Sequence, residues 1–184
     1  MEERVAIFID GGNLYHSLKK DFNGNKINFE KFVRKLAGDR TLFRVYYYAA
    51  LPRQQDDPEN YRVQQRFLDS LDHKPYFDVH VGKLIVQNGT KKELGLDVKL
   101  AVDMLEMAYT DSYDTAILVS GDGDMTSAVE AVKRHGKHVE NVCVRNHLSP
   151  HLRKICDRVI ILDNLFLNDC WEHNSIPEEN SIHS

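Results

Sequence analysis

The sequence has few cysteines, no long apolar run and no signal-peptide pattern. Its cysteines, Cys143, Cys156 and Cys170, are too few and too widely spaced for a disulfide framework or a cysteine zinc site. No stretch approaches the roughly 20 apolar residues of a membrane span. The first residues, MEERVAIFID, run into a strand pattern without the segments of a signal peptide. These absences predict a cytoplasmic protein with reduced thiols and no membrane contact.

An excess of basic charge, common in nucleic-acid-binding proteins, is also missing. The 184 residues carry 24 basic and 28 acidic side chains, a formal net charge of -4. A polyanionic partner is not excluded, because four acids gathered into one metal site would leave both signs balanced elsewhere. The candidate basic patches, each more simply explained as a solvated helix or loop end, are Lys91 and Lys92, the run 133–138, and Arg145, Arg153, Lys154 and Arg158.

Apolar runs of strand length alternate with segments of helical period, which predicts an α/β fold with a mainly parallel sheet. We expect strands at residues 5–9, 42–51, 77–81, 115–120, within 138–144, and at 159–162. The third could extend through 83–87 to a turn at Asn88 and Gly89. Helices are expected after Asn13, from an Asn28 cap to Gly38, around 63–71, over about 97–109, up to Gly136, and from Ser149 and Pro150. One domain should cover residues 1–165, followed by a largely mobile tail over 166–184.

Acidic residues follow two of the predicted strands. Asp10 ends the first strand, and Asp122 and Asp124 follow another in the stretch VSGDGDM. Ligands of parallel α/β sheets bind beyond the carboxyl ends of the strands, where the strand order reverses, so these acids are expected to be neighbours. Carboxylates this close repel each other unless a cation lies between them. The pattern therefore predicts a site for a hard divalent cation, Mg²⁺ or Mn²⁺.

A further acid lies on the helix predicted over about 97–109. Asp97 projects from the apolar face formed by Leu100, Ala101, Met104, Leu105 and Ala108. Asp103 projects from the opposite side, where pairing with Lys99 or solvation would suffice. The helical wheel therefore ranks Asp97 above Asp103 as a ligand, although Asp97 is equally well explained as an N-cap.

Four stretches together resemble the NYN domain family, also called LabA-like, of the PIN-like nuclease superfamily. They are IDGGN at 9–13, LGLDVKLAVDML at 94–105, LVSGDGDM at 118–125 and SPHLRKICDRVIIL at 149–162, and the resemblance covers roughly residues 4–163. It is specific because the separate motifs occur in the family's order, each beside the strand or helix that the periodicity predicts.

The resemblance implies a three-layer α/β/α sandwich that cleaves RNA phosphodiesters with Mg²⁺ or Mn²⁺. Asp10, Asp97, Asp122 and Asp124 match the family's acidic positions and would bind metal and catalyse cleavage, as expected for metal-assisted hydrolysis. The polar positions beside the cleft, which would contact substrate, match Asn13 and Ser120. Asp103 also matches an acidic position, against the wheel, and would support the metal ligands. Where relatives often carry Lys, this chain has Leu94, which leaves Lys92 as the nearest ammonium for substrate.

Single-stranded RNA, held through its phosphates, is the expected partner, and a homodimer through exposed helices is compatible with a domain of this size. A haloacid-dehalogenase-like phosphatase would need an aspartate where Gly12 stands, and a topoisomerase-primase type of site would need Glu in place of Asp10. The GDGD stretch lacks the spacing of a dinucleotide-binding loop. The stronger alternative is a module that keeps the acidic pocket but acts by binding RNA or protein.

Overall fold

The computed structural model describes residues 2–87, 90–93 and 95–172, with the backbone alone for 83–87 and 90–93. The strands are β1 (Arg4–Asp10), β2 (Thr41–Leu51), β3 (Phe77–Gln87), β4 (Thr90–Glu93), β5 (Thr115–Val119), β6 (His138–Val144) and β7 (Arg158–Leu162). The helices are α1 (Gly11–Asp21), α2 (Phe29–Ala37), α3 (Pro58–Asp72), α4 (Leu96–Tyr109), α5 (Thr126–Arg134), α6 (Pro150–Ile155) and α7 (Asn164–Leu167), with short 3₁₀ turns η1 (Gly123–Met125) and η2 (Arg145–His147).

The strands form one sheet in the order β4-β3-β2-β1-β5-β6-β7. The pairs from β3 across to β7 are parallel, and only the short edge strand β4 runs antiparallel, against β3. This confirms the predicted α/β fold with a mainly parallel sheet. The order runs outward in both directions from β1, so the chain reverses its direction of winding between β1 and β5.

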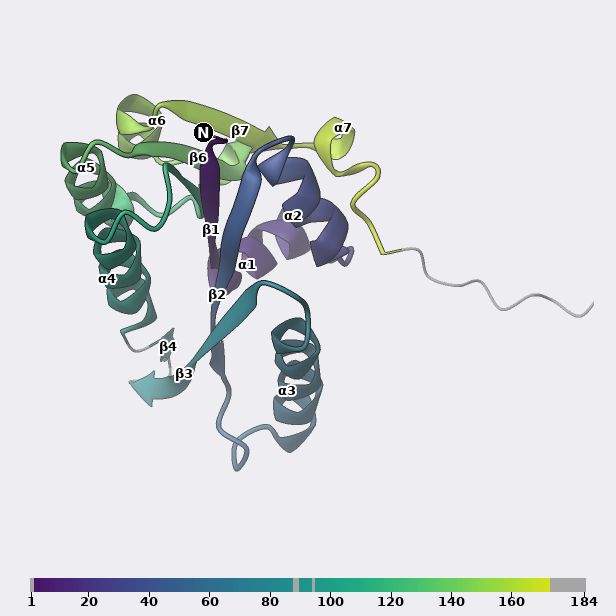
Figure 1. Cartoon of the computed structure of the whole chain (residues 1–184). Coiled ribbons are helices and arrows are strands. Elements are labelled where there is room, and N and C mark those ends of the chain that lie inside the picture. Colours follow the sequence, from purple (N-terminus) through teal and green to yellow (C-terminus); the bar gives the residue numbers. More distant parts are fainter. Residues whose placement is uncertain (1, 88–89, 94, 173–184) are drawn as a thin grey trace, which may run out of the picture.

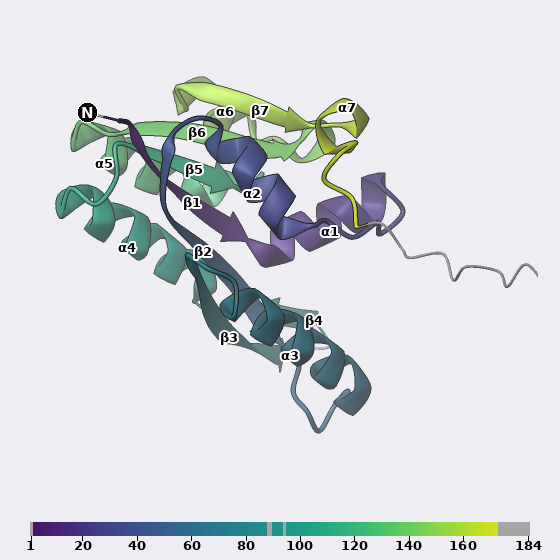
Figure 2. The same cartoon turned by 45° about the vertical axis from the view of Figure 1, so that its right-hand side comes forward.

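Helices cover both faces of the sheet and make a three-layer α/β/α sandwich. Figures 1 and 2 show α4, α5 and α6 on one side, and α1, α2 and α3 on the other. The central strand β1 divides its side chains between the two sides by ordinary strand alternation. Val5, Ile7 and Ile9 enter the core beneath α1 and α2, whereas Ala6 and Phe8 enter the core beneath α4 and α5.

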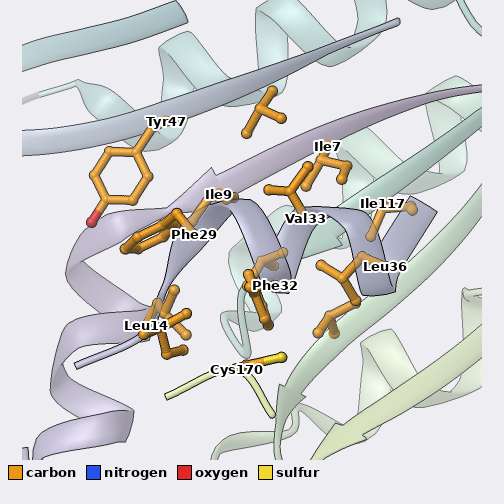
Figure 3. Close-up of a cluster of buried hydrophobic side chains, with 14 of the residues drawn as sticks. Ile7, Ile9, Leu14, Phe29, Phe32, Val33, Leu36, Tyr47, Ile117 and Cys170 are labelled. Carbon is orange, nitrogen blue, oxygen red and sulfur yellow. The ribbon is translucent and has the colours of Figure 1, made fainter. Parts of the chain in front are cut away.

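The core beneath α1 and α2 contains the helix whose boundaries the sequence predicts best. Asn28 caps α2 with its side chain, which accepts a hydrogen bond from the Lys31 backbone N–H, and Gly38 ends the helix with a positive φ of 61°. The apolar residues of this helix point into the core together with Ile7, Ile9 and Leu14 (Figure 3). The cap, stop and apolar period agree with each other, so this prediction is confirmed.

The edge of the sheet extends the third predicted strand. β3 continues through Gln87, as proposed, and pairs with β4. The turn predicted at Asn88 and Gly89 lies outside the described residues. β4 was not predicted, because its sequence, TKKE, has no apolar alternation.

The chain after β7 differs from the predicted tail. The boundary placed at residue 165 falls inside α7, and both Leu167 and Cys170 are fully buried against the core beneath α2. Trp171 forms a β-bridge with Ile27. The residues up to Glu172 therefore belong to the folded domain, while 173–184 lie outside the described residues. Cys143, Cys156 and Cys170 are all free.

Candidate metal centre at the ends of β1 and β5

The two acidic stretches meet where the sequence predicts. β1 and β5 are adjacent parallel strands, with Ile9 opposite Val119, so Asp10 and Ser120 leave the sheet side by side. Asp10 caps α1, and Asp122 caps η1. Because the strand order reverses between these strands, their ends border the crevice in which such sheets bind ligands.

Asp10 is held by two hydrogen bonds. Its Oδ1 accepts a bond of 2.9 Å from the backbone N–H of Asn13, and its Oδ2 accepts one of 3.0 Å from the hydroxyl of Ser120. The first is the ordinary N-cap bond of a helix that begins at Gly11. The second crosses from β1 to the loop after β5 and fixes the orientation of the carboxylate.

Asn13 and Ser120 also hold the loop after β5. The Asn13 side-chain oxygen accepts a hydrogen bond of 3.0 Å from the backbone N–H of Gly121. The Ser120 hydroxyl accepts one of 3.2 Å from the backbone N–H of Asp122. The structure therefore places both residues beside the acids, as expected, where they position Asp10 and the loop. Their predicted contact with substrate stays a prediction.

The remaining acids lie on the loop after β5 and at the start of α4. The Oδ1 of Asp122 accepts a hydrogen bond of 2.9 Å from the backbone N–H of Asp124, which folds the loop into η1. Asp97 lies in the first turn of α4, and the left-handed Gly95, not Asp97, occupies the N-cap position. The side chain of Asp97 makes no N-cap hydrogen bond, so the alternative explanation as a cap is wrong.

Burial and neighbouring charges shift the pKa of two of these carboxylates. Burial raises the pKa of Asp10, hydrogen bonds from Asn13 and Ser120 oppose this shift, and the charges of Asp97 and Asp122 add to it. Partial desolvation raises the pKa of Asp97, and the charges of Asp122 and Asp124 raise it further. Within the described residues, no basic side chain forms an ion pair with any of the four. Their mutual repulsion is left without a compensating charge.

The fit to a metal ion can be judged from these donors. Among the described residues, no three His, Cys, Asp or Glu side chains form a ready-made metal site. Both oxygens of Asp10 and one of Asp122 accept hydrogen bonds from the protein. The donor set is nevertheless all carboxylate, which is the chemistry that Mg²⁺ and Mn²⁺ prefer. The residues therefore fit a hard cation in kind, and binding would require some of these side chains to turn.

Asp103 corrects the helical wheel. The sequence placed this residue on the solvent side of its helix, but it is only 4% exposed and lies on the buried face of α4. The predicted pairing with Lys99 is present, at 2.5 Å. The wheel left out Leu96, and the buried face of α4 runs through Leu96, Leu100 and Asp103. Asp97, which the wheel placed on the buried face, is exposed, so that part of the prediction is also wrong.

A buried tyrosine supports Asp103 from the sheet. The hydroxyl of Tyr48, in β2, donates a hydrogen bond of 2.8 Å to Asp103 Oδ2. The ring of His80 stacks on Tyr48 at a centroid distance of 4.8 Å, and its Nε2 lies 3.7 Å from the same oxygen. Asp103 is thus already paired inside the protein, and its predicted support of the metal ligands stays a prediction.

Sequence reasoning missed two residues that shape the loops of the site. Asn141 is fully buried and donates hydrogen bonds to the backbone oxygens of Leu118 and Ser120, at 3.2 and 2.7 Å. An asparagine within the apolar run HVENVCV is the signal that could have revealed it. His147 lies against Gly121 through its backbone and contacts Asp21 through Nε2 at 2.8 Å.

The basic residues divide into paired and unpaired groups. Lys133 pairs with Asp157, Lys137 with Asp111, and Arg158 with Glu140, so these side chains are partly neutralised. In the described part of the chain, no ion pair involves the exposed residues Arg145, Arg153 and Lys154. The backbone of Lys92 lies in β4, but its side chain and the departure at Leu94 lie outside what is described.

Comparison with known proteins decides the family. The family model described as NYN domain matches residues 4–163. The chain belongs to the NYN domain family. This confirms the resemblance read from the four motifs, and it places the protein among PIN-like folds, whose members are usually nucleases that use divalent metals.

The NYN assignment agrees with individual relatives. The Low amplitude and bright protein LabA of Synechococcus elongatus is 28% identical over 171 residues, which cover 88% of this chain and 85% of that protein. An uncharacterized protein of Methanocaldococcus jannaschii is 26% identical over 173 residues, and the match covers 91% of this chain but 59% of that longer protein. Neither name describes a catalytic activity.

The NYN fold is also seen in a solved structure. A crystal structure of a protein of unknown function from Vibrio parahaemolyticus superposes with a TM-score of 0.72 at 25% identity, and the match covers 93% of this chain and 97% of that one. Across the described residues, no helix has both the length and the apolar character needed to cross a membrane.

Proposed function

We propose that this NYN domain is a metal-dependent endoribonuclease that hydrolyses RNA phosphodiester bonds at Asp10, Asp97, Asp122 and Asp124. The observation that carries the proposal is that hydrogen bonds of Ser120 hold Asp10 beside the loop of Asp122 and Asp124 at the reversal point of the sheet. Burial and neighbouring carboxylates raise the pKa of Asp10 and of Asp97 there, and none of the four acids has a basic ion-pair partner among the described residues. Ionised carboxylates that lie near one another repel each other at neutral pH, and a bound divalent cation would offset that repulsion.

In this proposal, Mg²⁺ or Mn²⁺ would activate water for attack on phosphorus and stabilise the leaving oxygen. Asp10 would be the central ligand, since it has the most buried position and hydrogen bonds that fix it. Asp97 and Asp122 would complete the ligand set from α4 and the loop after β5. Asp124, which is exposed, would bind metal or orient water.

The basic side chains would hold RNA without reading its sequence. Arg145 follows β6 directly, and Arg153 and Lys154 lie on α6, which follows the loop that packs on η1 through Gly121, Gly123 and Ser149. Exposed cations beside the crevice would bind the phosphate groups of a flexible single strand, so binding should weaken steeply with salt.

The second candidate is a catalytically weak module that binds RNA or protein. It is favoured by one observation, that the described carboxylates are not arranged as a ready-made metal site. The two candidates differ in turnover, whereas both retain the acidic pocket.

The deciding assay incubates the purified protein with end-labelled single-stranded RNA and Mn²⁺ or Mg²⁺. We expect cleavage by the wild type and a loss of at least about a hundredfold in Asp10→Asn, as for other residues needed for the chemical step. Asp39→Asn, which removes an exposed carboxylate remote from the site, is the matched control and should cleave normally. RNA binding without cleavage would support the binding module, and cleavage that survives Asp10→Asn would come from a contaminant.

A further inference from the structure

A cavity of about 460 Å³ opens between α1 and α3, on the side of the sheet that α2 also covers. Its size lies within the range of small-molecule pockets, about 300 to 1,000 Å³. α1 contributes Leu14, Tyr15 and Leu18, and α3 contributes Val63 and Phe67, with Tyr47 of β2 at the bottom. Figure 2 shows α1 and α3 as separate helices on this side of the sheet.

The walls of this cavity expose apolar surface. Tyr15 is 56% exposed, Val63 60% and Phe67 38%. Scattered exposed apolar side chains are ordinary, but these three line one cavity, where a single ligand would cover them together. α3 buries only Leu68 and Leu71 within its core-facing side, so its amino-terminal half leaves Val63 and Phe67 open to a ligand.

Three aromatic rings fix the shape of the cavity. Phe67 lies 5.8 Å from Phe29 and 5.9 Å from Tyr47 between ring centroids, and Phe29 lies 5.5 Å from Tyr47. Tyr47 and Phe29 are nearly fully buried beside Leu14 (Figure 3), and both rings pack against Phe67. A rigid ring with an open side is a platform on which a flat base can stack.

The rim carries the groups that a nucleotide would need. Lys19 and Lys26 supply positive charge for a phosphate, against one acid, Glu172. Asn60 and Gln64 lie on the α3 wall, joined by a hydrogen bond of 3.2 Å from Gln64 Nε2 to Asn60 Oδ1. Side-chain amides both donate and accept hydrogen bonds, as base edges do.

The bottom of the cavity adjoins the acidic site. A Cβ added to Gly11 would lie 2.6 Å from the Tyr47 ring, so the ring of Tyr47 packs directly on the backbone of Gly11. Gly11 is the residue after Asp10, and any larger residue there would displace Tyr47. Tyr47, which lines the cavity, therefore contacts the residue that follows the proposed central metal ligand.

We propose that this cavity binds one base of single-stranded RNA, stacked on Phe67 and Tyr15, next to the phosphate held at Asp10. The inference rests on the proposed function for the identity of that phosphate. The amides of Asn60 and Gln64 then contact the base edge, and Lys19 and Lys26 hold the adjoining backbone. The proposed metal site contacts phosphates and reads no base. A base bound in the α1–α3 cavity would therefore fix which phosphodiester bond lies at Asp10.

The test measures binding of a fluorescein-labelled single-stranded RNA by anisotropy, with all variants in the Asp10→Asn background so that the RNA stays intact. Tyr15→Ala removes a stacking surface, and Val63→Glu places a negative charge at the mouth. Each should raise the Kd about tenfold, as expected for the loss of one stacked base. Thermal melts establish that each variant is folded.

Matched controls lie on the opposite side of the sheet. Tyr109→Ala and Val102→Glu make the same changes on α4, at residues that are 76% and 52% exposed. Both should bind RNA like the parent. Equal losses in cavity and control variants, or no loss in either, would overturn the proposal. With RNA in which the stacked base is replaced by an abasic site, Tyr15→Ala and its parent should have the same Kd.

A second measurement uses the wild-type protein and needs no variant to fold. In ¹⁵N-labelled protein titrated with a nucleoside 5′-monophosphate in EDTA, amide shifts should appear at Leu14, Asn60 and Gln64. An absence of shifts there, or shifts confined to the loop after β5, would contradict the base site. This measurement needs neither metal nor turnover. Nucleotide binding in the cavity can therefore be detected even if the nuclease assay is negative, and failure of the base site can be told apart from failure of the proposed nuclease activity.

Discussion

The hydroxyl of Ser120 donates a hydrogen bond of 3.0 Å to Oδ2 of Asp10, across 110 residues of sequence. It links the carboxyl ends of two adjacent strands and at the same time accepts a bond from the Asp122 backbone. One buried side chain thus sets the position of the acid at the end of β1 and the path of the loop that bears two others.

Removal of the Ser120 hydroxyl should loosen this arrangement. In Ser120→Ala, the backbone N–H of Asp122 loses its acceptor, and we expect the free energy of unfolding to fall by about 1–3 kcal/mol. The pKa of Asp10 should rise further, because a hydrogen bond that lowers it is lost. Urea denaturation and an NMR pH titration measure the two effects. Ser127→Ala, an exposed serine on α5, should be nearly neutral.

Divalent metal should stabilise the protein at neutral pH. The folded-state pKa values of Asp10 and Asp97 are raised, so without metal each costs stability as pH rises above the usual carboxyl range, and a bound cation reverses that cost. At a Mg²⁺ concentration of 100 times the Kd, the gain would be about 2.7 kcal/mol. Thermal melts in MgCl₂ and in EDTA test this. The gain should vanish in Asp10→Asn and persist in Asp39→Asn; identical melts for the wild type would argue against a metal site.

The Tyr48 hydroxyl should be worth more than that of its neighbour on the same strand face. Tyr48→Phe removes the bond to the buried Asp103, and we expect a loss of about 1–3 kcal/mol. Tyr46 is similarly buried, but its hydroxyl makes no hydrogen bond among the described residues, so Tyr46→Phe is the control and should cost less than about 1 kcal/mol. Chemical denaturation compares the two; equal losses would mean that the bond to Asp103 contributes nothing of its own.

An acid-sensitive pair ties the start of β1 to the start of β5. Hydrogen bonds from Arg4 lower the pKa of Asp114 to about 2. A depressed pKa in the folded state gives stability that is present above about pH 4 and is lost as the pH falls toward 2. Asp114→Asn should flatten the stability profile in this window, as followed by urea midpoints at stepped pH. Asp39→Asn should leave the profile as steep as in the wild type.

Gly121 should tolerate no side chain. A Cβ there would collide with the backbone oxygen of His147, and a backbone atom cannot move aside without shifting η2. We expect Gly121→Ala to cost about 1–3 kcal/mol, as overpacking of a core does. Gly123→Ala would meet mainly the rotatable hydroxyl of Ser149, at 2.8 Å, and should cost less. Thermal unfolding of both variants tests whether Gly121→Ala is the more destabilising. Equal losses, or a larger loss in Gly123→Ala, would mean that η2 moves aside easily.

The sequence predicts the described strands other than β4, because each of these is an apolar run bounded by polar residues, whereas β4 is polar. It predicts α2 because the Asn28 cap and Gly38 stop are local. It also brings Asp10 and Asp122 together, since parallel strands end at the same edge. The burial of Asp103 was beyond its reach, because that depends on Tyr48, which arrives from another strand. The α1–α3 cavity is of the same kind, because its walls come from helices far apart in the chain.

β1 lies in the middle of the sheet, between the segments that surround the acidic residues and those that form the α1–α3 cavity. The segments that follow β5 and β6 frame the acids from one flank, while α1, β2 and α3 form the aromatic cavity on the other. In the proposed nuclease, insertions or substitutions in α3 would change which RNA the cavity binds and leave cleavage at Asp10 unchanged. Diversity of target in such proteins is therefore expected to accumulate on the β2–β3 flank of the fold.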